Sequence, residues 1–378
     1  MTKITAVRST GLEYRMANGR AYGNARGMTA VRIATLIEIE TADGVVGLGE
    51  AWGPPTVVKA YVDILRPFFE GREIFDFNQV RHTLYARMYH AGIQNPMTAA
   101  LSGINVALYD IHAKLLGVPL CKLLGGKRLD RVPAYASTGY YSNDDSYGIA
   151  QQLEIGEAHR YPGTKIKIGA SVESDVERVK LAREMIGPDK LLMVDANGNL
   201  TVDQTLESMR AIAPYDIHWY EEPLPPHDFA GYTELTARAP MRVATGEALY
   251  TVHDFKRLTD GRCAHILQPD ITICGGLDET LAIAGIAYME NIHMEPHVWG
   301  GAVGLATAVH FLAAMPASPH TENVPHPAML EYDRGENPLR DDLLKEPIAE
   351  ADGWLTVPDK PGLGIELDPA VVKRFTVC

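Results

Sequence analysis

Ionisable residues close a series of short apolar segments between residues 164 and 297, at nearly regular intervals. In chain order they are Lys167, Asp195, Glu221, Glu247, Asp270 and His297. Each interval of 23 to 28 residues can hold one β-strand and one helical crossover, since a parallel connection needs about a dozen residues or more. One polar residue after a strand is usually a helix cap or a solvated loop residue. Six in succession, all acids or bases, indicate a catalytic site where several parallel strands end.

Three of these acids are predicted to share a metal ion. Counted from a first strand near residues 132–137, Asp195, Glu221 and Glu247 close the third, fourth and fifth strands, which are consecutive. Three carboxylates that converge in one arc cannot all stay ionised unless a cation neutralises them. Oxygen ligands with room for water and substrate suit Mg²⁺ or Mn²⁺ rather than Zn²⁺. The alternative is that the acids merely pair with Lys165, Lys167 and nearby arginines, and the regular spacing favours the metal.

The remaining members of the series are candidate acid and base groups. Asp270 and His297 close adjacent strands, so the carboxylate can hydrogen-bond the imidazole, orient it and raise its basicity. Lys165 and Lys167 lie two residues apart on one strand and therefore share a face, and crowding by Lys165 is expected to lower the pKa of Lys167. Lys167 and His297 would flank a substrate from opposite sides. This arrangement suits removal of a proton α to a carboxylate, with Mg²⁺ stabilising the enediolate.

The elements that must position these residues are a parallel barrel and an N-terminal domain of a different kind. Strands alternating with helices predict the barrel, with its active site at the C-terminal ends of the strands and its eighth strand near residues 329–331. Residues 1–125 lack this rhythm and are expected to form an α+β domain. Its predicted elements are a strand at residues 4–7, a hairpin at 31–40 and 45–50, and helices at 56–65, 75–89 and 98–116.

Composition and charge limit the partners of the protein. The chain has 378 residues, of which 46% are hydrophobic, and a formal net charge of −13. This acidity argues against nucleic acid or an anionic membrane surface as partner. The first residues lack the apolar stretch of a signal peptide, and the most apolar window, residues 303–315, is too short to span a bilayer. The four cysteines show neither metal-binding spacing nor a disulfide framework. We expect a cytoplasmic homo-oligomer that acts on a small molecule.

Taken together, these motifs resemble those of the mandelate racemase subgroup of the enolase superfamily, the mandelate racemase/muconate lactonizing enzyme family. The resemblance spans nearly the whole chain. It is carried by Lys165-Ile-Lys167, Asp195-Ala-Asn197, Glu221-Glu-Pro223, Gly246-Glu247, Gln268-Pro-Asp270 and Pro296-His297. The resemblance implies an α/β fold with a TIM-like (β/α)₇β barrel over residues 126–345. Residues 1–125 would be an α+β capping domain, completed by a C-terminal segment, residues 346–378, that packs back on it.

The resemblance also assigns roles to individual residues. It implies Mg²⁺ ligands at Asp195, Glu221 and Glu247, and acid/base groups at Lys167 and the His297–Asp270 dyad. Lys165 and Glu331 would hold the substrate carboxylate. A lid formed by residues 14–27 and the turn near Trp52 would select the substrate. Further candidate substrate-binding residues are Asn197, which shares a strand face with Asp195, and the lid arginines Arg15, Arg20 and Arg26, which offer bidentate donors to a carboxylate.

The predicted reaction is dehydration of an acid sugar, an aldarate or aldonate. Residues 270–315 and 329–364 are most similar to galactarolactone cycloisomerases and acid-sugar dehydratases. Cycloisomerisation of an aldarolactone is the alternative, followed by racemisation or epimerisation of a hydroxy acid. A metal-independent glycosidase would also use paired carboxylates, but it would not need Lys165 and Lys167. A non-catalytic sugar-acid binding protein could keep the metal and would not need the bases.

Overall fold

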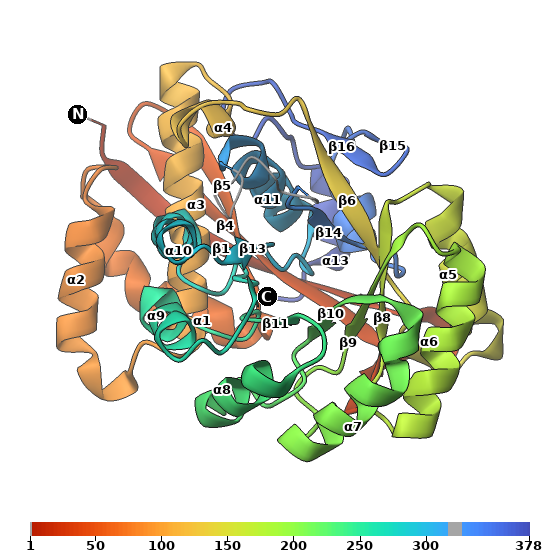
Figure 1. Ribbon diagram of the computed structural model, residues 1–378. Helices are drawn as coiled ribbons and strands as arrows, with labels where there is room; N and C mark the ends of the chain where they lie inside the picture. Colours follow the sequence, from red (N-terminus) through yellow and green to blue (C-terminus); the bar gives the residue numbers. More distant parts are fainter. Residues whose placement is uncertain (1, 317–326) are drawn as a thin grey trace.

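The N-terminal part of the chain is a small α+β domain. A computed structural model describes residues 2–316 and 327–378. In it an antiparallel sheet of order β1-β4-β5 carries three helices on one side (Figure 1). The elements are β1 (Ile4–Arg15), β4 (Val31–Thr41), β5 (Val46–Ala51), α1 (Pro55–Phe69), α2 (Phe77–Arg87) and α3 (Pro96–Leu116). The expected hairpin and helices are all present.

Two glycines let α3 lie directly on β5. A Cβ atom at Gly47 would come 2.1 Å from the carbonyl oxygen of Ala107, and one at Gly49 would come 2.0 Å from that of Gly103. Any larger side chain at these two positions would therefore push the helix away from the sheet. The close contact buries α3 along most of its length. Ile104 is fully buried, as are the α3 residues that face the two glycines, Gly103 and Ala107.

The second part of the chain is a parallel barrel. Within the described residues seven strands follow one another through parallel pairing from β13 to β6, and the eighth, β14, pairs in parallel with β6 (Figure 1). The strands are β6 (Arg131–Ser137), β8 (Gly163–Lys167), β9 (Leu191–Asp195), β10 (Ile217–Glu221), β11 (Val243–Thr245), β12 (Ile266–Leu267), β13 (His293–Met294) and β14 (Leu330–Asp333). The connecting helices are α5 (Ile149–Ala158), α6 (Val172–Ile186), α7 (Val202–Ile212), α8 (Phe229–Arg238), α9 (Thr251–Asp260), α10 (Gly276–Glu290) and α11 (Ala302–Ala314). The predicted (β/α)₇β barrel is confirmed.

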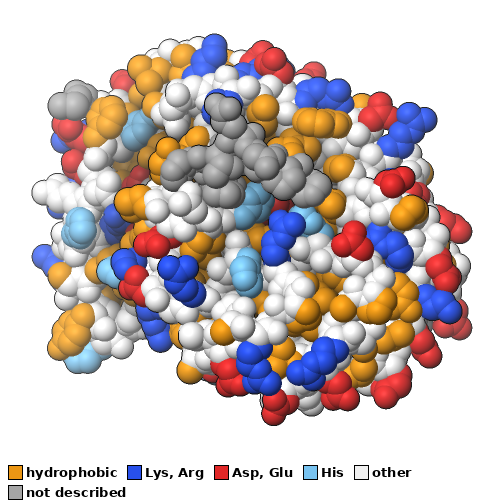
Figure 2. Space-filling view, in the orientation of Figure 1, with side chains coloured by type: hydrophobic (Ala, Val, Ile, Leu, Met, Phe, Trp, Pro, Cys, Tyr) orange, Lys and Arg blue, Asp and Glu red, His pale blue; other side chains and the backbone are white. Residues whose placement is uncertain are grey.

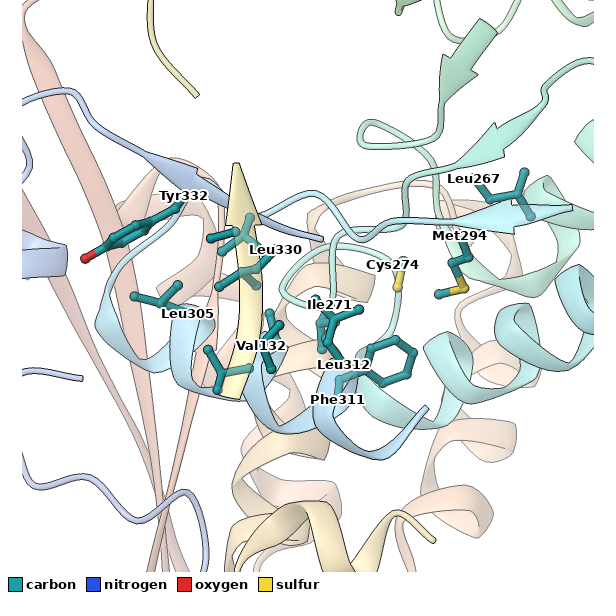
Figure 3. Packing of buried hydrophobic residues seen from close by; sticks show 14 of the residues in the cluster. Val132, Leu267, Ile271, Cys274, Met294, Leu305, Phe311, Leu312, Leu330 and Tyr332 are labelled. Atoms are coloured by element: carbon teal, nitrogen blue, oxygen red, sulfur yellow. The ribbon is translucent and has the colours of Figure 1, made fainter. Parts of the chain in front are cut away.

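Apolar side chains fill the barrel below its mouth. Tyr135, Met193 and Trp219, from three different strands, are fully buried and belong to one cluster inside the barrel. Outside it, apolar residues of the strands, such as Leu330, and of α11, such as Phe311, belong to one large cluster, part of which Figure 3 shows. Polar side chains at the strand ends therefore have room only at the mouth.

The predicted lid loop is more ordered than expected. Residues 14 and 15 end β1, and the segment that follows contains β2 (Tyr22–Asn24) and β3 (Gly27–Thr29). This hairpin pairs with β7 (Tyr141–Ser142), a short strand that follows the first barrel strand. The lid is therefore a three-stranded antiparallel ribbon attached to the barrel. Strands of two or three residues are too short to show the alternating pattern that identifies a strand in sequence.

The C-terminal residues contact both parts of the molecule. The strand β16 (Trp354–Thr356) pairs antiparallel with the start of β6 and with β15 (Glu350–Ala351). The last helix, α13 (Pro369–Phe375), then leads to the chain end, where the backbone of Gly11 in β1 exchanges hydrogen bonds with Val377 and Cys378. Within the described residues no helix combines the length and apolarity that a membrane span requires. Figure 2 shows acidic and basic side chains interspersed over the visible face.

Candidate active site

The three predicted metal ligands lie together at the barrel mouth. Asp195 and Glu221 end β9 and β10, and Glu247 follows β11 by two residues. One carboxylate oxygen from each lies within 4.8 Å of the other two. Oε2 of Glu247 is buried and accepts no hydrogen bond from the described residues. A cluster of oxygen ligands with an unused acceptor fits a hard divalent cation such as Mg²⁺.

Two residues that sequence reasoning missed hold Glu221 in place. The indole of Trp219 donates to Oε2 of Glu221 at 2.9 Å, and the side-chain amide of Gln268 donates to the same oxygen at 2.6 Å. Both residues are fully buried. Trp219 lies two residues before Glu221 on β10 and shares its face, so the strand period could have identified it. Gln268 precedes Asp270 in one of the motifs but gives no sequence signal of this contact.

Lys165 lies beneath the acidic cluster. Its ammonium pairs with Glu221, with Glu331 at 2.8 Å and with Asp195 at 3.9 Å, and the side chain is 1% exposed. Burial lowers the pKa of Lys165, but Glu221 and Glu331 outweigh it and hold the net pKa well above the ordinary value. Burial likewise acts to raise the pKa of Glu331, but Lys165 and His297 bring it down to about 2. Lys165 is thus a fixed cation and Glu331 a fixed anion.

Lys167 differs from the sequence expectation in its pKa. Burial lowers this pKa, and so does Lys165, but the carboxylates of Asp195, Glu247 and Glu221 raise it by more. The net pKa is above the ordinary value: Lys165 lowers it as predicted, but the expectation of a lowered net pKa is wrong because the carboxylates outweigh this effect. The ammonium contacts Oδ2 of Asp195 at 2.5 Å. The sequence spacing correctly predicted that the two lysines lie close together, but it did not show how close the carboxylates lie to Lys167.

The predicted dyad has the geometry of a hydrogen bond. Nδ1 of His297 lies 2.8 Å from Oδ2 of Asp270, whose other oxygen accepts from the backbone and hydroxyl of Thr272. Nε2 of His297 faces Glu247 at 3.5 Å and Glu331 at 3.8 Å. Burial lowers the pKa of His297, but these carboxylates raise it to a net value of about 10.

A cavity of about 450 Å³ opens above these groups, between the barrel and the lid. Lys167 and His297 both line it, as do Asn197, Glu247 and the predicted lid residue Trp52. Its walls also include aromatic residues that sequence reasoning did not select, namely Tyr22, Tyr140 and Trp299. Lys165, Asp195, Glu221 and Glu331 lie below its floor. The cavity is large enough for a small carboxylate.

The three lid arginines do not share one location. Arg26 lines the cavity. Arg15 lies at the end of β1, where it pairs with Glu13 at 2.8 Å and is 69% exposed. Arg20 pairs with Glu336. The structure therefore brings only one of the three to the cavity, namely Arg26, which lies in the turn between β2 and β3.

Comparison with known families agrees with this fold. Residues 149–371 match the family model described as "Enolase C-terminal domain-like". Residues 22–125 match the one described as "Mandelate racemase / muconate lactonizing enzyme, N-terminal domain". The chain belongs to the enolase superfamily, in its mandelate racemase subgroup.

Individual relatives indicate which classes of enzyme the protein resembles. The chain is 36% identical to the D-galactarolactone cycloisomerase of Agrobacterium fabrum over 376 residues, covering 99% of this chain and 98% of the relative. It is 34% identical to the arabinonate dehydratase of Saccharolobus solfataricus, covering 89% of each. A crystal structure of a racemase from Streptomyces coelicolor with bound magnesium is 28% identical, with a TM-score of 0.86 and coverage of 99% of this chain and 100% of that one. The protein is an enolase-superfamily enzyme of the lyase or isomerase type.

Proposed function

We propose that the enzyme removes the proton α to the carboxylate of a polyhydroxylated acid and eliminates the oxygen substituent on the neighbouring β carbon. One observation carries this proposal: Lys167 and His297 border the same cavity, and each lies against one member of the acidic cluster. Nζ of Lys167 contacts Asp195, and Nε2 of His297 faces Glu247. A substrate carboxylate above the acids would present its α carbon to both groups.

Asp195, Glu221 and Glu247 are the residues that would hold Mg²⁺, with Mn²⁺ expected to substitute. The bound cation would offset the charge of the three acids and of the substrate carboxylate, which favours negative charge on the substrate and lowers the pKa of the neighbouring ammonium and imidazolium. Lys165 and Glu331 lie within one ion-paired cluster below the cavity floor. Lys165 would add positive charge near the substrate carboxylate.

Proton transfer would be divided between the two remaining groups. Either Lys167 or His297, in its neutral form, takes the α-proton, and the electron pair of that C–H bond is delocalised into the substrate carboxylate as an enediolate. This electron pair then forms a C=C bond as the Cβ–O bond breaks. In an open-chain acid the oxygen leaves as hydroxide and receives a proton from the other group, which gives water. The product is an enol that becomes a 2-keto acid. Dehydration of an acid sugar is therefore the reaction that the paired groups support best.

Cycloisomerisation of an aldarolactone is a second candidate. In a lactone the β oxygen belongs to an ester and leaves as a carboxylate, which needs no proton. The same α-proton removal would then open the ring. The 36% identity to a D-galactarolactone cycloisomerase across nearly the whole chain favours this candidate. Racemisation, which needs two opposed bases and no leaving group, ranks third.

Metal removal and carboxylate variants test the proposal. A panel of acid sugars and their lactones would be assayed with Mg²⁺, then after dialysis against EDTA, then with Mg²⁺ or Mn²⁺ restored. Activity should vanish with the metal and return with it. Asp195→Asn, Glu221→Gln and Glu247→Gln should each lower kcat/KM by about 100-fold or more, since each removes a ligand to the main electrostatic stabiliser. Glu184→Gln, at a 63% exposed acid on α6, is the control. Full activity in EDTA would reject the proposal in favour of metal-independent hydrolysis.

A further inference from the structure

Arg26 is distinguished from the other lid arginines by having no acidic partner. Arg15 and Arg20 each pair with a glutamate, whereas no carboxylate of the described residues lies within ion-pair distance of Arg26. Its guanidinium makes one long hydrogen bond, from Nη1 to the backbone oxygen of Asn197 at 3.4 Å. The other cations that line the cavity, Lys167 and His297, are paired with Asp195 and Asp270. Most of the donors of Arg26 are therefore available to a ligand.

The position of this guanidinium is set by the loop that follows β9. Nη1 of Arg26 would lie 3.3 Å from a Cβ atom at Gly198, so the guanidinium lies against this loop. Asn197, which accepts its hydrogen bond, donates its own backbone N–H to Asp195 at 2.8 Å and its side-chain amide to Glu247 at 3.5 Å. Arg26 thus contacts Asn197, which in turn contacts two of the three acids, Asp195 and Glu247. It lies on the lid side of the cavity. A substrate held by its reacting carboxylate at the acids would extend toward it.

We propose that Arg26 binds the far carboxyl end of the substrate, and that the natural substrates are therefore aldarates or aldarolactones rather than aldonates. This inference rests on the proposed function. In an open-chain diacid, Arg26 would bind the second carboxylate through two parallel N–H donors. In a lactone, the Cβ–O bond breaks and the ring oxygen keeps the electron pair, becoming part of a new carboxylate. Arg26 would stabilise the negative charge that develops there.

Substrate discrimination by Arg26 variants tests this site. Wild type, Arg26→Gln and Arg26→Lys would be assayed with Mg²⁺ against aldarates, aldarolactones and aldonates of matched chain length and configuration. Hydrogen bonds to charged groups contribute about 1.5–3 kcal/mol, so Arg26→Gln should lower kcat/KM for the first two classes by about 10- to 100-fold. The loss for aldonates should be less than about threefold, because they leave Arg26 without a charged partner. Arg26→Lys should retain part of the activity. Arg160→Gln, at a 79% exposed arginine, controls for the change of net charge.

A binding measurement gives a readout that does not require turnover. With Mg²⁺ present, glutarate, an inert dicarboxylate, should bind Arg26→Gln more weakly than wild type, while pentanoate should bind both alike. Equal loss for diacids and monoacids would assign Arg26 to lid structure and overturn the proposal. Wild-type turnover restricted to aldonates would overturn it too, while leaving the proposed elimination intact. Loss of metal dependence would instead reject the proposed function itself.

Discussion

Lys165 and Lys167 share one face of β8 but differ in what they can do. Lys165 is enclosed below the acids and pairs with Glu221 and Glu331. Lys167 is one step nearer the mouth and lines the cavity. We therefore expect only the second ammonium to reach the α carbon of a bound substrate. The distinction depends on a single strand step, because residues two apart on a strand are about 6–7 Å apart along it.

The two candidate bases should act on opposite faces of the substrate. Lys167→Ala should abolish exchange of the α-proton with one α-epimer while exchange with the other stays measurable, and His297→Asn should show the reverse. The reason is that the two side chains approach the cavity from different walls. NMR in D₂O would follow exchange for both epimers of a sugar acid that the enzyme turns over. If both variants lost exchange with both epimers equally, the opposed placement would have to be abandoned.

Asp270 should act through His297. Its carboxylate is one of the groups that raise the pKa of His297 to about 10. Asp270→Asn should therefore lower this pKa and move the His297-dependent limb of the pH–rate profile to lower pH. It should reduce kcat by about 10- to 100-fold, a typical cost of losing an orienting partner. A variant with reduced kcat but an unmoved limb would show that Asp270 only supports the loop.

The ionisable residues at the strand ends could be predicted from the sequence, whereas the side-chain contacts around them could not. Spacing placed Asp195, Glu221 and Glu247 on neighbouring strands, because each βα unit has a nearly constant length. The support of Glu221 by Gln268, and the separation of Arg26 from Arg15, depend on side-chain directions that spacing does not encode. The roles of all these residues stay predictions until variants are assayed.

At the scale of elements, β5 of the capping domain is joined to α11 of the barrel. Glu50, near the end of β5 and 1% exposed, accepts hydrogen bonds from the backbone N–H groups of Gly301 and Gly304. These groups begin α11, and the loop before them carries His297. A carboxylate at a helix N-terminus is favourable because it meets unpaired N–H groups there. The sequence predicted the strand at residues 45–50 but gave no sign that it meets this helix.

Substitution by alanine should have opposite effects on stability at Gly300, which lies at this junction, and at Gly285, which lies outside it. A Cβ at Gly300 would fall 2.3 Å from Oε1 of Glu50, whereas one at Gly285, within α10, would meet nothing within 4 Å. Gly300→Ala should cost about 1–3 kcal/mol, as overpacking does, and should lower kcat by displacing the His297 loop. Gly285→Ala should stabilise by about 0.5–1 kcal/mol, since alanine favours a helix. Thermal unfolding and steady-state kinetics would measure both. Equal effects of the two variants would contradict the predicted contact.

At the scale of the whole molecule, polar contacts join the capping domain to the barrel helix α10. Arg81 of α2 pairs with Glu279 at 2.7 Å, and the hydroxyl of Tyr109 in α3 donates to Asp278 at 2.6 Å. Together with Glu50, these contacts make the relative placement of the two parts depend on ionisable groups. The homo-oligomer expected from sequence stays a prediction, which light scattering would test.

The contribution of Glu50 to the free energy of unfolding should fall as pH rises. Burial raises the pKa of this carboxyl from 4.5 to about 7, and the N–H groups of Gly301 and Gly304 offset the effect only in part. Between these two pH values the folded protein binds a proton that the unfolded chain has released, so the free energy of unfolding falls as pH rises through this window. The full change is about 3 kcal/mol.

The variant Glu50→Gln isolates this contribution, because glutamine keeps the shape of the protonated side chain and does not ionise. The melting temperature of the variant minus that of wild type should increase from pH 5 to pH 8, while the pH response of all other groups cancels in the difference. Glu184→Gln, at an exposed acid, should show no such trend. A difference that stayed constant with pH would mean that Glu50 titrates as in the unfolded chain. A difference that decreased would mean that the start of α11 stabilises the carboxylate by more than burial destabilises it.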